Sequence, residues 1–150
     1  MRPLYLLGRL IFGGYFVYNG INHFMNSEGM SQYAAAKGVP APEKAVPATG
    51  AMLVAGGLSI MAGLKARQGL ATVIAFLLPV TLQMHRFWAV DDPQQRMNET
   101  VNFSKNLALI GATLMLLQLE HPWPASLDSA RTGEEMFVHL GGRNLRSLPA

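Results

Sequence analysis

Four long runs of apolar residues, separated by polar stretches, dominate the chain. They cover residues 4–24, 46–64, 69–90 and 103–119. Each run is close to the roughly 20 residues that an α-helix needs to cross the hydrocarbon core of a bilayer. The pattern therefore predicts an all-α fold, a four-helix transmembrane bundle with a short soluble C-terminal tail.

The polar stretches between the runs predict the connections. Residues 25–45 and 91–102 have the composition of loops, and residues 37–42 carry glycine and proline in the pattern of a helix breaker. Lys65, Ala66 and Arg67 leave room only for a tight turn, so the second and third spans should form a hairpin. Two segments are predicted: a membrane domain at residues 1–124 and a polar tail at 125–150, with a short helix near residues 128–140.

The amino-acid composition excludes several kinds of protein function. The chain is 50% hydrophobic and only 14% charged, which favours a lipid environment. It contains no cysteine, so disulfides, thiolate zinc sites and cysteine-ligated iron–sulfur clusters are excluded, and no metal site is predicted. The net charge is +3, but the basic residues are scattered at the ends of the apolar runs, so nucleic acid is not an expected partner.

Small residues recur every fourth position in the second run. They are Ala51, Ala55, Ser59 and Gly63. This spacing puts them on one face of a helix, where a neighbouring helix can approach closely and gain van der Waals contact. We expect this face to be a site of helix packing.

Polar and aromatic residues gather where three of the runs meet the same side of the membrane. The candidate ligand-binding residues are Asn19, His23, His85, Trp88, Lys105 and Asn106. Such groups are costly in hydrocarbon unless they are paired or solvated, so they should face inward. One hypothesis is a pocket for a quinone headgroup or another amphipathic ligand, with no intrinsic cofactor.

Two other interpretations of these residues stay open. They could be hydrogen-bonding contacts between helices and anchors at the level of the lipid headgroups. Alternatively, His23 and His85 could be axial ligands of a bound haem.

Arg9 stands apart as the single charge inside the first run. We expect a structural role, in which its guanidinium pairs with Glu120, Gln118 or the carbonyl groups at a helix end.

Short motifs occur in a fixed order along about the first 120 residues. They are Gly8-Arg9, Asn19-Gly20, Lys37-Gly38-Val39-Pro40, Pro47, Gly56-Gly57, His85-Arg86-Phe87-Trp88, and Asn102-Phe103 followed by Lys105-Asn106 and Gly111. Their order and spacing resemble the DoxX family of small bacterial integral membrane proteins. The resemblance implies a four-helix membrane bundle in the bacterial cytoplasmic membrane. It also implies association with redox systems, including a thiosulfate:quinone oxidoreductase subunit and a membrane complex with superoxide dismutase and a sulfurtransferase.

One departure from the family pattern affects the chemistry. Many members carry an acidic residue in the second span, a few positions before the paired glycines, whereas residues 51–54 here contain no carboxylate. A proton-transfer role that depends on that acid is therefore not carried over.

Two functions of different class follow. The first is an accessory or quinone-proximal membrane subunit of a redox complex, with redox proteins in the membrane as partners. The alternative is a non-enzymatic membrane scaffold, or a carrier that binds a lipid or a small solute, since no complete catalytic constellation is evident. Both are compatible with an oligomer.

The orientation of the chain gives a first testable prediction. Lys65 and Arg67 flank the hairpin turn without a nearby acid, which favours a cytoplasmic turn and, with four spans, cytoplasmic termini. Reporter fusions after Ala66 and after Ala125 should both read cytoplasmic, and a fusion within residues 25–45 should read external. The opposite readings would invert the topology.

Overall fold

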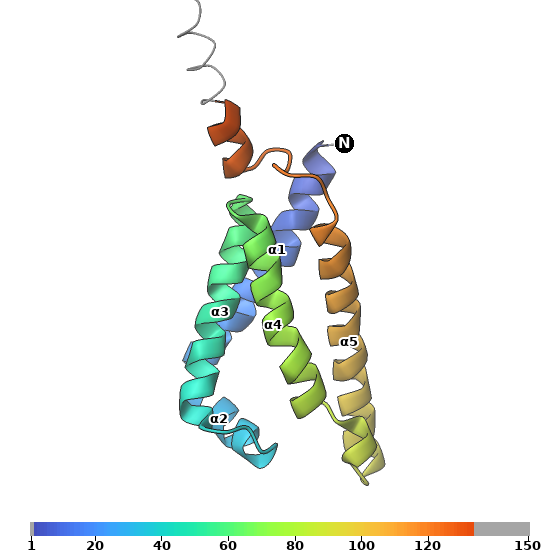
Figure 1. The fold of residues 1–150 in the computed structure, drawn as a ribbon. Helices are drawn as coiled ribbons and strands as arrows, with labels where there is room; N and C mark the ends of the chain where they lie inside the picture. Colours follow the sequence, from blue (N-terminus) through green and yellow to red (C-terminus); the bar gives the residue numbers. More distant parts are fainter. Residues whose placement is uncertain (1, 134–150) are drawn as a thin grey trace, which may run out of the picture.

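Long helices build almost the whole molecule. The computed structural model describes residues 2–133. Its long helices are α1 (Arg2–Met25), α3 (Pro42–Ala62), α4 (Ala66–Met84) and α5 (Pro93–Leu117), which lie side by side (Figure 1). The described residues contain no strand, so the predicted all-α class is confirmed.

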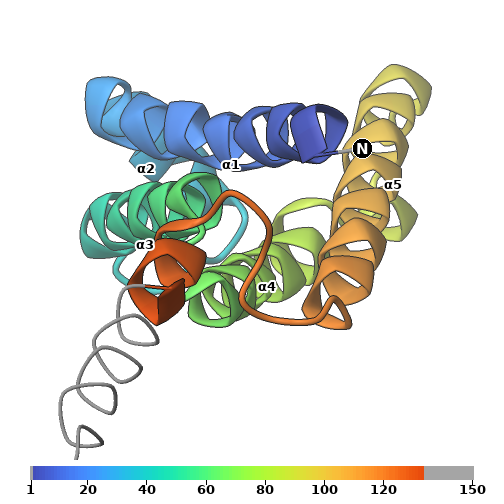
Figure 2. The same ribbon diagram turned by 90° about the horizontal axis from the view of Figure 1, so that it is seen from above.

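Shorter helical elements lie at one end of the bundle. Helix α2 (Ser27–Ala36) and the 3-10 turn η1 (Phe87–Ala89) are found there, and we call this the α2 end. The opposite end, which we call the turn end, holds the start of α1 and the turn between α3 and α4. Seen from above, α3 lies between α1 and α4, and α4 lies between α3 and α5 (Figure 2).

Three of the helical stretches are long and apolar enough to cross a membrane. Within the described part of the chain, they are Pro42–Ala62, Ala66–Ala89 and Pro93–Leu117. Helix α1 has 24 residues and is long enough, but it is not among these three. The sequence contains Arg9, Asn19 and Asn22 within α1, and these residues lower its mean hydropathy.

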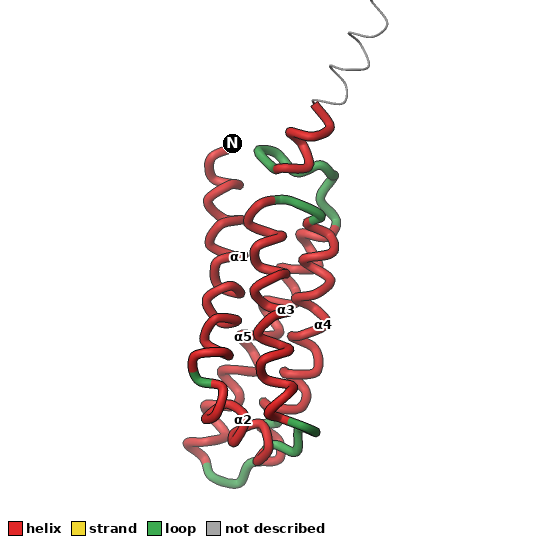
Figure 3. Tube along the Cα trace, turned by 90° about the vertical axis from the view of Figure 1, so that its left-hand side faces the viewer, coloured by secondary structure: helices red, strands yellow, loops and turns green. Residues whose placement is uncertain are grey.

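The structure corrects several predicted boundaries. The stretch 25–45 is not a simple loop, because α2 occupies its first half, and α5 begins at Pro93 inside the predicted loop 91–102. The start of α5 has a recognisable cause: the carboxylate of Asp92 accepts a 2.7 Å hydrogen bond from the Gln95 backbone N–H, and proline is well tolerated at the first helical position. The tube in Figure 3 shows helix along most of the chain, with the loops near the ends of the bundle.

Helices α1 and α3 touch through their backbones. A Cβ atom on Gly57 would lie 2.6 Å from the carbonyl oxygen of Gly13, and one on Gly20 would lie 2.6 Å from that of Gly50. No side chain fits at these two crossings, and close backbone approach is the usual basis of helix packing in lipid. The glycines therefore set the distance between α1 and α3.

The predicted small-residue strip packs against the rest of the chain only in its second half. Ala51 and Ala55 are exposed, whereas the neighbouring Gly56 meets Gly69 of α4, where an added Cβ would lie 3.1 Å from the Gly69 carbonyl oxygen. Ser59 lies at the same contact. Gly63 is also buried, against Arg9 and Ser126. In the first half of the strip, the contacts are made by the paired glycines instead of the alanines, because glycine permits a closer approach.

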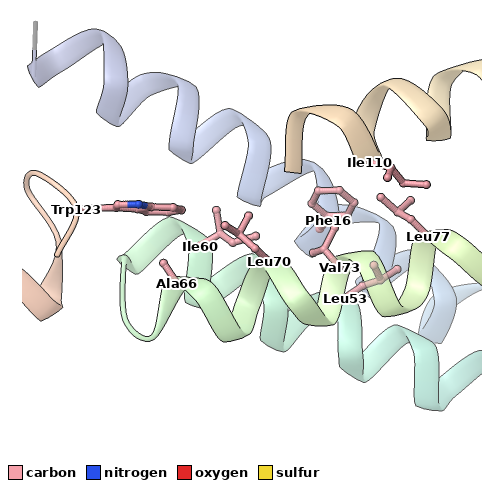
Figure 4. Close-up of a cluster of buried hydrophobic side chains, with 9 residues drawn as sticks. All are labelled: Phe16, Leu53, Ile60, Ala66, Leu70, Val73, Leu77, Ile110 and Trp123. Atoms are coloured by element: carbon pink, nitrogen blue, oxygen red, sulfur yellow. The ribbon is translucent and has the colours of Figure 1, made fainter. Parts of the chain in front are cut away.

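The apolar core runs along the inner faces of the four long helices. Figure 4 shows its buried side chains, which are Phe16, Leu53, Ile60, Ala66, Leu70, Val73, Leu77, Ile110 and Trp123. They come from every long helix and from the segment after α5. Many large apolar residues lie instead on the outer surface, as a lipid environment would favour.

The segment after α5 folds back over the turn end. Trp123 is only 1% exposed, and the Asp128 carboxylate accepts a 2.8 Å hydrogen bond from the Lys65 backbone N–H. Residues 127–133 are helical, and the side chains of Ser126 and Ser129 each accept a hydrogen bond from the other's backbone N–H at the start of this helix. The rest of the helix predicted near 128–140 lies outside the described residues.

The contact between α1 and α3 gives a stability prediction. Gly57→Ala should lower the free energy of unfolding in detergent by about 2 kcal/mol, because its Cβ would collide with backbone atoms of α1. Gly14→Ala is the matched control: a Cβ at Gly14 meets nothing within 4 Å, so the stability should stay the same or rise slightly. Equal stability of the two variants would contradict the close approach.

Candidate functional site

A buried carboxylate organises the α2 end of the bundle. Glu99, near the start of α5, is 4% exposed. Its Oε1 accepts hydrogen bonds from the Tyr33 hydroxyl at 3.0 Å and the Lys37 ammonium at 2.5 Å, and its Oε2 lies 2.8 Å from Nδ1 of His85. A buried charge must be paired and hydrogen-bonded to be tolerated, and this carboxylate has three partners.

The partners of Glu99 come from three different parts of the chain. Tyr33 and Lys37 are one helical turn apart at the end of α2, and His85 directly follows α4. The Lys37 carbonyl oxygen also accepts a 2.7 Å hydrogen bond from the Gln83 side chain. Together these contacts fasten α2 to the ends of α4 and α5.

The same contacts shift two pKa values outside the spans. The hydrogen bond to Glu99 raises the pKa of Lys37 above its ordinary value, although burial of the ammonium opposes this rise. Burial, followed by the hydrogen bond to Glu99, raises the pKa of Tyr33. Both groups therefore keep their protons at neutral pH, and the Lys37–Glu99 pair is a salt bridge.

A cavity of 660 Å³ lies beside this network. It is bounded by α2 and the loop after it, by α3 and α4, and by the end of α1. Its walls are mostly apolar, with Phe76 in edge contact with the His23 ring at 5.8 Å between ring centroids. The polar side chains that line the cavity are His23, Tyr33, Thr49, Gln83 and His85. The volume is within the range of small-ligand pockets.

The structure brings together only some of the predicted ligand-binding residues. His23 and His85 line the same cavity, although they come from α1 and from the segment after α4. Asn19 supports His23, because its backbone carbonyl lies 2.7 Å from His23 Nδ1. The cavity is thus built around two of the six predicted residues and is supported by a third.

The other three predicted residues lie outside the cavity. Trp88 is 57% exposed on η1 and packs edge-on against Phe103. Helix α4 ends at Met84, before the predicted end of the third run at residue 90, so His85 and Trp88 do not lie on one continuous helix. Lys105 hydrogen-bonds to a neighbouring side chain on the surface of α5, and Asn106 is buried on α5 but does not line the cavity.

Sequence reasoning missed Glu99, the residue that holds the network together. It was assigned to a charged loop, and a lone acid in such a loop gives no sign of burial. One usable signal was the Asp92-Pro93 helix start, which puts Glu99 in the second turn of a helix that becomes apolar further along. Tyr33 and Lys37 were missed because α2 was not predicted.

Possible metal ligands do not cluster in the described residues. No group of three or more histidine, aspartate or glutamate side chains that could hold a metal ion occurs between residues 2 and 133. The two histidines at the cavity do not test the haem hypothesis, which stays a prediction.

Arg9 lies at the turn end, far along α1 from this cavity. It is 6% exposed, and its guanidinium donates hydrogen bonds to the carbonyl oxygens of Pro124 at 3.3 Å and Ala125 at 2.6 Å. Its partners are thus carbonyl groups of the chain after α5, not Glu120 or Gln118. Trp123 packs in the same region, edge-on to the ring of Tyr5.

Removing the charge of Glu99 should loosen the α2 end. Glu99→Gln leaves the half-buried Lys37 ammonium without its carboxylate, and losing a hydrogen bond between charged groups typically costs about 2 kcal/mol. Hydrogen exchange in α2 should become faster, and thermal stability in detergent should fall. Glu43→Gln, at an exposed position on α3, is the control and should behave like the wild type. Unchanged exchange in the Glu99 variant would mean that the network does not hold α2.

Comparison with known proteins identifies the family. Neither the comparison with curated proteins nor that with solved structures finds a match. The DoxX family model matches residues 4–86, more than half of the 150-residue chain. The match includes α1 to α4 and ends just after His85, so the chain belongs to the DoxX family.

Proposed function

We propose that the chain is a four-span protein of the bacterial cytoplasmic membrane, with α1 as the fourth span. Two observations support α1 in this role. Its outward face carries a continuous apolar stripe, which includes Leu4, Leu7, Ile11 and Tyr18. Its internal charge, Arg9, is turned into the protein and bound to carbonyl groups, so lipid does not meet the guanidinium.

We further propose that the cavity at the α2 end binds the ring headgroup of a quinone-type ligand. The observation that carries this proposal is the shared lining of the cavity by His23 and His85 within otherwise apolar walls. An amphipathic ring ligand needs an apolar surface for its ring and a few fixed polar groups for its oxygens. The cavity combines both features near the end of the spans, where such a ligand can enter from the lipid.

Binding of this kind suits an accessory subunit of a redox complex. The chain has no cysteine, and the described residues contain no group of metal ligands, so it would present a ligand to a redox partner rather than carry a redox centre of its own. Family membership supports the membrane setting, and the redox assignment rests on the chemistry of the cavity.

A cavity-filling variant tests the ligand proposal. Val80→Trp, within the lining, should weaken binding of a decyl-substituted benzoquinone to the detergent-solubilised protein by at least about tenfold, because it occupies the space of the ring. Val101→Trp makes the same change at an exposed position on α5 outside the cavity, and it should bind like the wild type.

Identification of the native occupant gives an independent outcome. Mass spectrometry of gently extracted protein should find a quinone in the wild type and less of it in Val80→Trp. A phospholipid or another solute in its place would favour the alternative function, a scaffold or carrier. The same amount of quinone in both variants would rule out this cavity as the binding site.

A further inference from the structure

Most of the polar side chains at the cavity use their hydrogens in bonds within the protein. His23 Nδ1 lies 2.7 Å from the backbone carbonyl oxygen of Asn19. A carbonyl oxygen can only accept a hydrogen bond, so Nδ1 carries the hydrogen. In the neutral ring, Nε2 then offers a lone pair and no donor.

His85 is fixed in the same tautomer by a different partner. Its Nδ1 lies 2.8 Å from a carboxylate oxygen of Glu99, and the charge of Glu99 is already balanced by Lys37. A neutral His85 that donates through Nδ1–H satisfies this carboxylate and leaves its own Nε2 as an acceptor.

The remaining polar side chains of the lining follow the same rule. Tyr33 donates its hydroxyl hydrogen to Glu99, and Thr49 donates to the backbone carbonyl oxygens of Ala45 and Val46. Gln83 is a partial exception: it donates one Nε2 hydrogen to the Lys37 carbonyl oxygen and keeps a second N–H beside its amide oxygen Oε1. The free hydrogen-bonding capacity that these five side chains offer is therefore mainly that of lone pairs.

We infer that the cavity selects a ligand with hydroxyl donors, the reduced quinol rather than the oxidised quinone. This inference rests on the proposed function and specifies the redox form of its ligand. A quinol has two O–H groups that can donate to imidazole Nε2 atoms. A quinone has carbonyl oxygens only, which would face the two imidazole lone pairs with no hydrogen between them, and unpaired buried acceptors are costly. The second N–H of Gln83 could serve only one of its two oxygens.

Such a preference has a redox consequence. A quinol bound tenfold more tightly than the quinone raises the midpoint potential of the bound two-electron couple by about 30 mV. The protein would then hold the reduced form against oxidation until a redox partner removes the electrons.

Three matched ligands test the inference. A decyl-substituted benzoquinol, its oxidised quinone and its di-O-methyl ether share the ring, and only the quinol has hydroxyl donors. Their affinities for the solubilised wild-type protein are measured without oxygen at about pH 8, where an ordinary imidazole is neutral. Because the chain has no cysteine, a chemical reductant can keep the quinol reduced without altering the protein.

The quinol should bind at least about tenfold more tightly than either of the other two ligands, as expected for the gain of one or two buried hydrogen bonds. His23→Phe keeps an aromatic ring against Phe76 but removes the Nε2 acceptor. It should reduce the quinol preference by about fivefold and leave the quinone affinity nearly unchanged. Trp88→Phe, outside the cavity, is the control and should keep the full preference.

The outcomes separate the inference from the proposed function. If the quinone binds as tightly as the quinol or more tightly, the inference is wrong while the proposed ligand class stands. A full quinol preference in the folded His23→Phe protein would also overturn it, since the acceptor would then play no part. If none of the three ligands binds, the proposed function is wrong and the inference fails with it.

Discussion

A buried carboxylate needs partners, and this requirement shapes the α2 end of the molecule. Glu99 would be strongly destabilising on an apolar helix if it stood alone. Its partners Tyr33, Lys37 and His85 bring α2 and the end of α4 against α5, and they close one side of the cavity. The same bonds fix which nitrogen of His85 carries its hydrogen. Glu99 therefore determines where Tyr33, Lys37 and His85 lie at this end of the cavity and how they form hydrogen bonds.

The two ends and the middle of the bundle are held by different physical means. In the middle, glycines allow the backbones of α1 and α3 to touch, and the gain is van der Waals contact without polar groups. At the ends, charged side chains are satisfied by carboxylate or carbonyl oxygens. This division leaves the polar chemistry concentrated near the membrane surfaces, where a ligand or partner can reach it.

The sequence allowed the helical fold to be predicted better than the site. Apolar runs of membrane length are a strong signal, and each run coincides with a long helix, although α5 begins at Pro93, well before its run. Helix α2 was missed because a ten-residue helix in a polar stretch gives only a weak periodic pattern. His23 and His85 were found because ionisable residues at the ends of apolar runs are unusual. Glu99 could not be found in this way, since its importance comes from three residues that are 14 to 66 positions away in the chain.

The bonds between Arg9 and the carbonyl oxygens of Pro124 and Ala125 also bear on biogenesis. More than a hundred residues separate the two sides of this contact, so α1 is synthesised well before its guanidinium can meet these carbonyls. Until then a charge on this largely apolar helix is better placed near lipid headgroups or water than in hydrocarbon. The segment around Pro124 and Ala125 thus completes the surroundings of a side chain that was made more than a hundred residues earlier.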